Sequence, residues 1–289
     1  MTKVGFVGLG VMGNSMAKHL MAAGHQLFVY NRTQAKADEV VHLGATRCLT
    51  PQEVAQKADV VMTIVGYPKD VEEVYFADNG LFAGAHSESI FVDLTTSTPS
   101  LAIKIADAAG QAGSKSLDAP VSGGDLGARE ARLTTMVGGE TATLEAVRDL
   151  LEVFSAKVTL QGSAGAGQHT KMANQIMIAG TMTGMVELLV YAEAAGLELE
   201  TVLDTVGGGA AANWSLANYA PRILAKDFTP GFFAKHFLKD LTIALAEAER
   251  MEISLPGTQL AAELYQKLCD AGYGDDGTQA LIKLWKKFA

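Results

Sequence analysis

The sequence predicts two domains, a doubly wound α/β domain followed by an all-α domain. In residues 1–163, short apolar runs rich in β-branched residues alternate with amphipathic segments, which is the pattern of parallel strands joined by helices. In residues 164–289 the periodicity is helical throughout. A chain of 289 residues is long enough for two domains that each bury a core. We therefore place the domain boundary between residues 163 and 164.

The first strand runs into three glycines, Gly8, Gly10 and Gly13, and a helix-like segment at 12–23 and a second strand at 26–30 follow. In a βαβ unit this spacing serves a tight turn, the close approach of a pyrophosphate and the packing of helix on strand. The helix N-terminus adds free N–H groups and the positive end of a dipole. The alternative is a tight βα turn without a ligand. We predict a Rossmann-type domain that binds a dinucleotide. The residues between the glycines, Leu9, Val11 and Met12, belong to the same predicted cofactor-binding segment.

The residues after the second strand, Asn31, Arg32 and Thr33, favour NADP over NAD. NAD sites usually place Asp or Glu there to accept a hydrogen bond from the ribose 2′-OH. No carboxylate stands in this segment to repel a 2′-phosphate, and the guanidinium of Arg32 suits one. In the alternative interpretation, Asn31 and Thr33 cap the next helix and Arg32 is a solvated surface charge.

The remaining elements follow from the same patterns. Ligands of open α/β sheets bind outside the carboxyl ends of the strands, so we expect Val65, Thr95 and Thr96 near the cofactor. Thr50-Pro51 and Thr98-Pro99 are typical helix starts. Further strands are expected at residues 59–65, 89–93, 115–119, 133–137 and near 158, and helices at 33–43, 101–112, 141–154, 168–195, 200–206, 214–225, 234–251, 256–271 and 278–288.

The turn Ser122-Gly123-Gly124 combines a hydroxyl with two successive glycine amides. Such a segment can hold a carboxylate, although by itself the motif is as often only a turn. The segment Gly162–Gly167 lacks the Gly-Lys-Ser/Thr of a phosphate-binding P-loop, and we interpret it as a hinge into a long helix.

Composition limits the partners. The net charge of −9 and the absence of a Lys/Arg cluster argue against nucleic acid. The six histidines show no spacing typical of metal ligands, so no metal site is expected.

The sequence also indicates the compartment. Cys48 and Cys269 form neither a disulfide framework nor a C-x-x-C motif, and the N-terminus lacks the pattern of a signal peptide, so we expect the protein in the cytoplasm. The apolar segment 176–197 suits a buried helix of a soluble protein better than a membrane span, and it suggests a homodimer or homotetramer.

Lys171 and Asn174 stand three residues apart on the first long helix and so share a face. A lysine in a helix rich in Met, Ala and Ile can be desolvated and can exchange protons. Spacing alone favours the alternative, a surface lysine whose apolar stem lies along the protein.

Four motifs occur in one order along nearly the whole chain. They are Gly8-Leu9-Gly10-Val11-Met12-Gly13, Asp118-Ala119-Pro120-Val121-Ser122-Gly123-Gly124, Gly165-x-Gly167-x-x-x-Lys171-x-x-Asn174 and Lys239-Asp240-Leu241. With them the chain resembles the β-hydroxyacid dehydrogenases, a family that includes 3-hydroxyisobutyrate dehydrogenase, tartronate semialdehyde reductase and glyoxylate/succinic semialdehyde reductase.

This resemblance implies an NADP-dependent oxidoreductase, with NAD possible, that moves a hydride between the nicotinamide and a small hydroxyacid or semialdehyde carboxylate. It implies that Lys171 is the catalytic acid/base, that Asn174 orients the substrate, and that Ser122, Gly123 and Gly124 bind its carboxylate. Arg32 matches the NADP-preferring members. Positions lining the substrate or cofactor are matched by Thr96, Phe232, Lys239 and Asp240.

The chain departs from two related families. The 6-phosphogluconate dehydrogenases are longer and carry the motif Lys-x-x-His-Asn-Gly-Ile-Glu-Tyr. In the corresponding segment, which starts at Lys171, this chain has Ile178 where the motif has Glu. Ile178 cannot donate a proton, so decarboxylation lacks the second acid that it needs. Imine reductases usually replace the lysine at position 171. An imine reductase-like enzyme and a catalytically inactive dinucleotide-binding relative are the alternatives, and the intact Lys171 argues against both.

Overall fold

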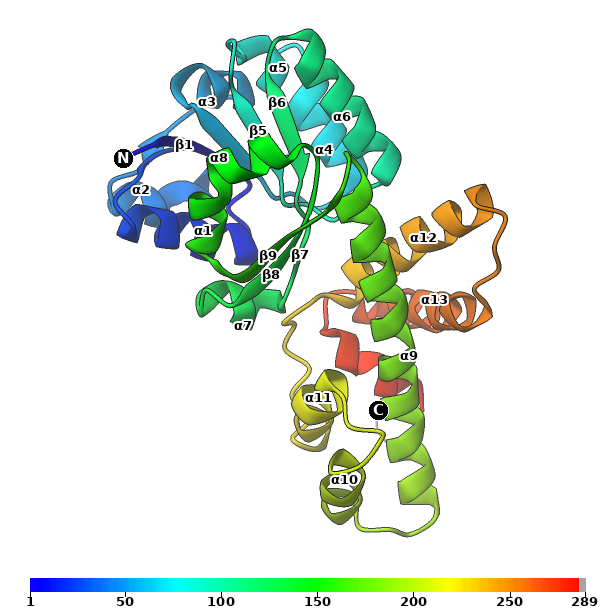
Figure 1. Cartoon of the computed structure of the whole chain (residues 1–289). Coiled ribbons are helices and arrows are strands. Elements are labelled where there is room, and N and C mark those ends of the chain that lie inside the picture. The colour runs from blue at the N-terminus through cyan, green and yellow to red at the C-terminus, as the bar shows by residue number, and fades with distance from the viewer. Residues whose placement is uncertain (286–289) are drawn as a thin grey trace. The chain divides into compact units, whose positions relative to one another are not determined.

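The structure is a computed structural model that describes residues 1–285. It divides into two compact units, Met1–Lys171 and Met172–Ala289, which we call the N-terminal unit and the helical unit. Their elements are labelled in Figure 1, in which the N-terminal unit runs from blue to green.

A nine-stranded sheet forms the centre of the N-terminal unit, in the order β3-β2-β1-β4-β5-β6-β8-β7 with β9 on β8. The pairs from β3 through β6 are parallel, β8 pairs antiparallel with β6 and β7, and β9 is parallel to β8. The carboxyl ends of the six parallel strands β3, β2, β1, β4, β5 and β6 therefore meet at one edge. The strands are β1 Lys3–Val7, β2 Gln26–Tyr30, β3 Thr46–Arg47, β4 Val60–Thr63, β5 Ile90–Asp93, β6 Lys115–Asp118, β7 Val121–Ser122, β8 Leu133–Gly138 and β9 Ser155–Gly162.

Successive residues of the sheet point alternately into two apolar cores, one on each face of the sheet. Met62 of β4 packs in a core with Leu20 of one helix and Val147 of another. Its neighbour Val61 packs in a second core with Tyr75. Helices thus cover both faces of a mainly parallel sheet, and the predicted fold class is confirmed. The helical segments of this unit are α1 Val11–Ala22, a 3₁₀ turn Gln34–Ala37, α2 Asp38–His42, α3 Pro51–Lys57, α4 Pro68–Phe76, α5 Leu81–Gly84, α6 Pro99–Gln111, α7 Gly124–Arg129 and α8 Thr141–Glu152.

Local signals predicted several boundaries well. β2 covers the predicted residues 26–30, and the predicted caps are present because Thr50 Oγ1 accepts from Glu53 N and Thr98 Oγ1 accepts from Leu101 N. Other predictions were less accurate. The predicted helix 33–43 is a 3₁₀ turn followed by one short helix, the strand near Val158 has eight residues, and α4, α5 and α7 were not predicted.

The helical unit is all-α, as predicted. Its core holds Phe237 and Tyr265, whose ring centroids lie 4.9 Å apart in an edge-to-face arrangement. The predicted helix 256–271 ends at Leu268 and continues as a π-helical turn, and the predicted helix 278–288 is a 3₁₀ segment up to Leu284, with its last residues outside the described range. The helical segments are α9 Ala166–Ala194, which begins in the N-terminal unit, α10 Leu199–Gly207, α11 Trp214–Leu224, α12 Ala234–Arg250, α13 Pro256–Leu268, the π turn Cys269–Tyr273 and the 3₁₀ segment Thr278–Leu284.

Helix α9 is long and apolar. Within residues 1–285 it is the one helix with the length and composition to cross a membrane, and 39% of its most apolar window is buried. Core helices of soluble proteins pass the same test, so this finding does not establish a membrane span. Met177 and Tyr191 on α9 are 66% and 76% exposed.

Candidate active site

The glycine loop after β1 has the geometry that a pyrophosphate requires. Gly8 has φ +97°, and a Cβ there would lie 2.0 Å from the carbonyl oxygen of Ile64. A Cβ at Gly13 would lie 1.9 Å from the carbonyl oxygen of Gly8, whereas one at Gly10 would have no neighbour within 4 Å. Gly8 thus makes the turn, Gly13 permits close packing and Gly10 leaves open space at the start of α1. The residues present fit a dinucleotide.

The other predicted members of this segment lie differently. The Leu9 side chain is buried in the core, and Met12 packs against that core. Val11 is 56% exposed at the first residue of α1. Gly8 N and Leu9 N already donate to Tyr30 O and Asn31 Oδ1, so the part of this segment open to a ligand is the start of α1 at Gly10 and Val11.

Asn31 connects the loops after β1 and β2. Its Oδ1 accepts a hydrogen bond from Leu9 N at 2.8 Å, and its Nδ2 donates to Thr33 O at 2.8 Å. The structure shows no side-chain cap by Thr33 on the 3₁₀ turn that follows. Asn31 therefore holds the glycine loop in place, and the alternative of a helix cap at Asn31 and Thr33 is wrong.

Arg32 pairs with a carboxylate that the sequence analysis did not expect at this place. Its Nη1 lies 3.0 Å from Asp70 Oδ1, and the two side chains are 77% and 13% exposed. Asp70 Oδ2 accepts from Tyr67 N at 3.1 Å and so also fixes the start of α4. The segment 31–33 itself holds no carboxylate, but the strand order β2-β1-β4 brings α4, and with it Asp70, to the same edge of the sheet. No local signal marks this pair, whose members are 38 residues apart.

Buried polar groups join the loops after β4 and β5. Thr95 is 1% exposed, its Oγ1 accepts from Val65 N at 3.0 Å, and its own N–H donates to Asp93. Thr95 therefore ties the two loops together. Its neighbour Thr96 and Val65 are half-buried at the same edge.

Two buried aspartates end the adjacent strands β5 and β6. Asp93 and Asp118 are register partners and are each 4% exposed. Burial raises the pKa of Asp93 to about 6, opposed by hydrogen bonds from Thr95 and Thr63, while the charge of Asp118 raises it further. Burial also raises the pKa of Asp118, opposed by the amides of Gly165 and Gln168. Sequence reasoning did not assign these carboxyl groups a role.

Lys171 lies in the second turn of α9 and is 6% exposed. The alternative of an exposed surface lysine is wrong. The preceding segment, which we interpreted as a hinge, is tightly packed within the N-terminal unit. A Cβ at Gly167 would lie 2.4 Å from Met136 O, and Asp118 Oδ1 accepts from Gly165 N at 2.7 Å.

The predicted carboxylate site leads from a strand into a short helix. Ser122 is half-buried and pairs with Thr134 of β8. Gly123 and Gly124 have φ of +130° and +63°, and α7 starts at Gly124. Glycine is favoured at such angles, and the first amides of a helix have no partner within it. The turn therefore presents a hydroxyl and backbone amides together.

In the helical unit, a chain of hydrogen bonds between side chains joins α9 and α12. Asn174 Nδ2 donates to Gln175 Oε1 at 2.7 Å, and Gln175 Nε2 donates to Asp240 Oδ2 at 2.6 Å. Lys239 Nζ lies 3.1 Å from Asp240 Oδ1, and Asp240 is 1% exposed. Sequence reasoning missed Gln175, for which its position beside Asn174 was the one available signal. Phe232 packs against the core ring of Phe237 at a centroid distance of 5.9 Å.

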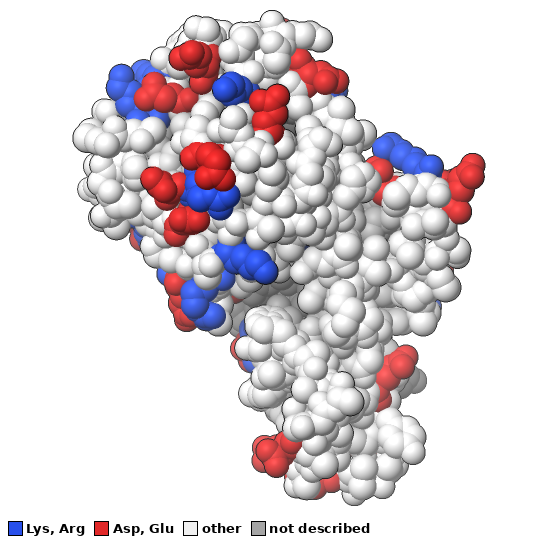
Figure 2. All heavy atoms as spheres, viewed as in Figure 1, with Lys and Arg blue, Asp and Glu red and all other residues white. Residues whose placement is uncertain are grey.

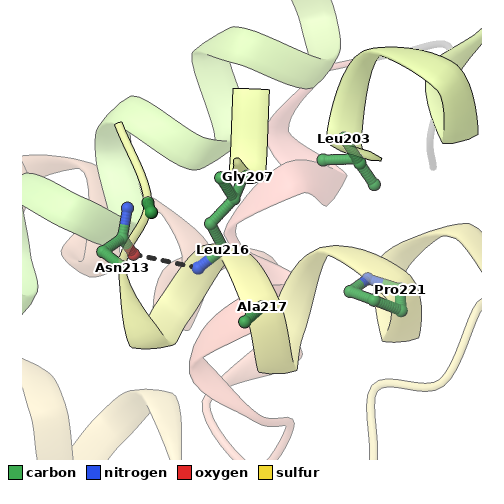
Figure 3. Close-up of a pocket in the computed structure, with 7 residues that line it drawn as sticks. Leu203, Gly207, Asn213, Leu216, Ala217 and Pro221 are labelled. Carbon is green, nitrogen blue, oxygen red and sulfur yellow. Dashed lines mark hydrogen bonds between the residues drawn. The ribbon is translucent and has the colours of Figure 1, made fainter. Parts of the chain in front are cut away.

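A cavity of about 170 Å³ lies between α10 and α11 (Figure 3). Its walls are mostly apolar, and the Oδ1 of its one amide side chain, Asn213, already accepts from Leu216 N at 2.9 Å. The cavity offers no reactive group. Its lining residues are Leu203, Gly207, Ala212, Asn213, Leu216, Ala217 and Pro221.

No group of three or more His, Cys, Asp or Glu that could hold a metal ion occurs within residues 1–285. On the face shown in Figure 2, basic and acidic side chains of the N-terminal unit are interspersed. The exclusion of nucleic acid stays a prediction from composition.

Comparison with known proteins covers both units. Residues 3–162 match the family described as the NAD binding domain of 6-phosphogluconate dehydrogenase. Residues 165–285 match the family described as 'NAD-binding of NADP-dependent 3-hydroxyisobutyrate dehydrogenase'.

Three similar proteins match over 96–99% of their own length. The uncharacterised oxidoreductase YkwC of Bacillus subtilis is 50% identical over 284 residues, 98% of this chain and 99% of the relative. The 2-hydroxy-3-oxopropionate reductase of Escherichia coli is 36% identical over 281 residues, 97% of this chain and 96% of the relative. The structure of Mycobacterium tuberculosis 3-hydroxyisobutyrate dehydrogenase with L-serine superposes with a TM-score of 0.90 at 30% identity, over 99% of each chain. The resemblance predicted from the motifs is confirmed, and the chain belongs to the β-hydroxyacid dehydrogenase family of NAD(P)-binding oxidoreductases.

Proposed function

We propose that this protein catalyses reversible hydride transfer between NADP(H) and a small β-hydroxyacid or semialdehyde that carries a carboxylate. The substrate class is that of 3-hydroxyisobutyrate, tartronate semialdehyde, succinic semialdehyde or glyoxylate. The observation that carries the proposal is the burial of Lys171. The lysine directly follows a turn whose backbone amides, those of Gly165 and Gln168, donate to Asp118 at the carboxyl end of β6.

In this proposal the protein supplies orientation and a proton. When bound, the nicotinamide gives or accepts the hydride. Lys171 Nζ donates a proton to the developing alkoxide oxygen during reduction and removes it during oxidation. A catalytically inactive relative would have no use for a buried lysine at this position, because burial of an ammonium group is costly.

The substrate carboxylate is assigned to Ser122, Gly123 and Gly124. The hydroxyl and the amides at the start of α7 supply hydrogen-bond donors without a full positive charge. Asn174, Phe232 and Asp240 of the helical unit are assigned to substrate orientation by family resemblance. Thr96 and Lys239 are assigned to the cofactor on the same ground.

NADP(H) is the proposed cofactor, with NAD(H) as a weaker one. Arg32 is exposed and able to meet a 2′-phosphate, and the family matched by residues 165–285 is described as NADP-dependent. Asp70 beside Arg32 reduces the positive charge there, so we expect a preference and not an absolute requirement.

The test is a substrate pair of equal length. We expect kcat/KM with NADPH to be at least tenfold higher for succinic semialdehyde than for butanal, because donors left unpaired by butanal cost about 1–3 kcal/mol. Ser122→Ala should lower the rate for succinic semialdehyde more than for butanal. Ser87→Ala, at an exposed serine outside the proposed site, is the control and should change neither rate. Equal values for the two aldehydes would remove Ser122–Gly124 from the mechanism.

We also propose a cytoplasmic homodimer or homotetramer. Support comes from two free cysteines without a disulfide and from exposed apolar residues on α9, such as Tyr191. Sedimentation equilibrium tests the oligomeric state, and a monomer at micromolar concentration would contradict it.

A further inference from the structure

We propose that Gln168 is a positioning residue for Lys171: its side-chain amide fixes the first turn of α9 on the loop after β5, and this sets the place of the lysine amine. The inference rests on the proposed role of Lys171 in proton transfer. Neither the motifs nor the family resemblance assigned Gln168 a role.

Both polar atoms of the Gln168 side chain are hydrogen-bonded. The residue is 0% exposed, its Oε1 accepts from Ser97 N at 2.9 Å, and its Nε2 donates to Thr95 O at 2.8 Å. Both partners are backbone groups of one loop, 71 and 73 residues away in the chain. The amide offers a donor and an acceptor at the end of the side chain, so an ionised Glu, a Met or a Leu cannot make both bonds.

The backbone of the same turn is held from the next strand. Asp118 Oδ2 accepts from Gln168 N at 2.9 Å, and Asp118 Oδ1 accepts from Gly165 N at 2.7 Å. Gly167 between them has no space for a side chain. The loop after β5 and the end of β6 thus fix the first turn of α9 by four hydrogen bonds whose donors and acceptors are buried.

Lys171 follows Gln168 by three residues, so both lie on one face of the helix within one turn. The turn that carries Gln168 cannot shift without moving Lys171. One buried amide therefore sets the place of Lys171, and Gln168, its two loop partners and Lys171 all belong to the N-terminal unit.

The first experiment compares two buried glutamines. Gln168→Met keeps the length but removes both hydrogen bonds, and we expect kcat to fall by about 100-fold, because a displacement near 1 Å can cost that much. The Kd for NADPH should change by less than about threefold. Gln279→Met is the matched control, since Gln279 is also 0% exposed and donates to Asp227 O at 3.0 Å and Thr229 O at 3.2 Å in the helical unit. It should lose stability to a similar degree without a comparable loss of kcat.

The second experiment asks whether Gln168 acts through Lys171. In a Lys171→Ala background, Gln168→Met should lower the residual rate no further, since residues that act as a unit are not additive. A full additional loss in that background, or a kcat in Gln168→Met equal to that of Gln279→Met, would overturn the inference and leave the proposed function intact. A near-normal rate in Lys171→Ala alone would instead overturn the proposed function.

Gln168→Glu serves if the methionine variant does not fold. Its carboxylate keeps an acceptor for Ser97 N but faces the Thr95 carbonyl without a proton, and protonation restores the donor. The loss of kcat relative to the wild type should therefore shrink as the pH falls. A loss that does not depend on pH would contradict the assignment of the Nε2 donor.

Discussion

Arg32 shows how far a single residue can be interpreted from local sequence. Its place after the second strand predicted a 2′-phosphate contact, and that interpretation depends on three adjacent residues only. Asp70 could not be predicted, because its approach to Arg32 depends on the strand order β2-β1-β4. The role of Gly13 was predictable for the opposite reason, since its closest contact is the carbonyl oxygen of Gly8 within the same motif.

Arg32→Ala should weaken NADP(H) by roughly 10- to 150-fold and leave NAD(H) almost unchanged, since a hydrogen bond to a charged group contributes about 1.5–3 kcal/mol. Fluorescence titration of both cofactors measures the two Kd values. An equal loss for both would show that Arg32 does not bind the 2′-phosphate.

Asp70→Asn should strengthen NADP(H) by roughly threefold to tenfold, because it removes a negative charge close to the phosphate while an amide oxygen can still accept from Tyr67 N. Glu72→Gln is the control. Glu72 lies on the same helix and pairs with Lys104, and removing its charge should not change the preference for NADP(H) over NAD(H). Weaker binding of NADP(H) by Asp70→Asn would mean that Asp70 chiefly holds Arg32 in place.

At the scale of elements, strands and caps were predictable where the signal is local. Apolar runs gave β4 and β5, and Thr-Pro pairs gave the starts of α3 and α6. Helix α4 was missed although Pro68 and Asp70 stand at favourable positions in its first turn, because Tyr67 is not a usual cap residue. The aspartates that end β5 and β6 were visible in the sequence, but the hydrogen bonds of Asp93 with Thr63 and of Asp118 with Gly165 join residues 30 and 47 positions apart.

Asp93 makes stability depend on pH in a definite direction. Its pKa is raised from 3.8 to about 6 in the folded protein, so between pH 4 and pH 6 the folded state holds more protons than the unfolded state. This group therefore contributes stability that is present below about pH 4 and is lost as the pH rises through 6, by up to about 3 kcal/mol. Denaturant unfolding of the wild type and Asp93→Asn should show the wild type losing this advantage between pH 4 and pH 7. A difference between the two proteins that stays constant over this range would refute the assignment.

At the scale of the whole molecule, the order of the domains and the family could be predicted, because four motifs in sequence order are specific and each is local. Partnerships such as Gln175 with Asp240, 65 residues apart, could not be predicted, since helical periodicity places a residue on a face without naming its partner. The same limit applies to Gln168, which stands at an unspecified position inside a motif and binds a loop 71 residues away.

The central claim is that Lys171 transfers the proton that accompanies hydride transfer. The most direct measurement is turnover of succinic semialdehyde with NADPH by Lys171→Ala and Lys171→Arg, beside the Kd of each variant for NADPH. We predict that both variants fold and bind NADPH normally and that both lose turnover by roughly 10²- to 10⁴-fold, because arginine keeps the charge but cannot exchange the proton. Turnover close to that of the wild type in either variant, with NADPH binding intact, would contradict the account.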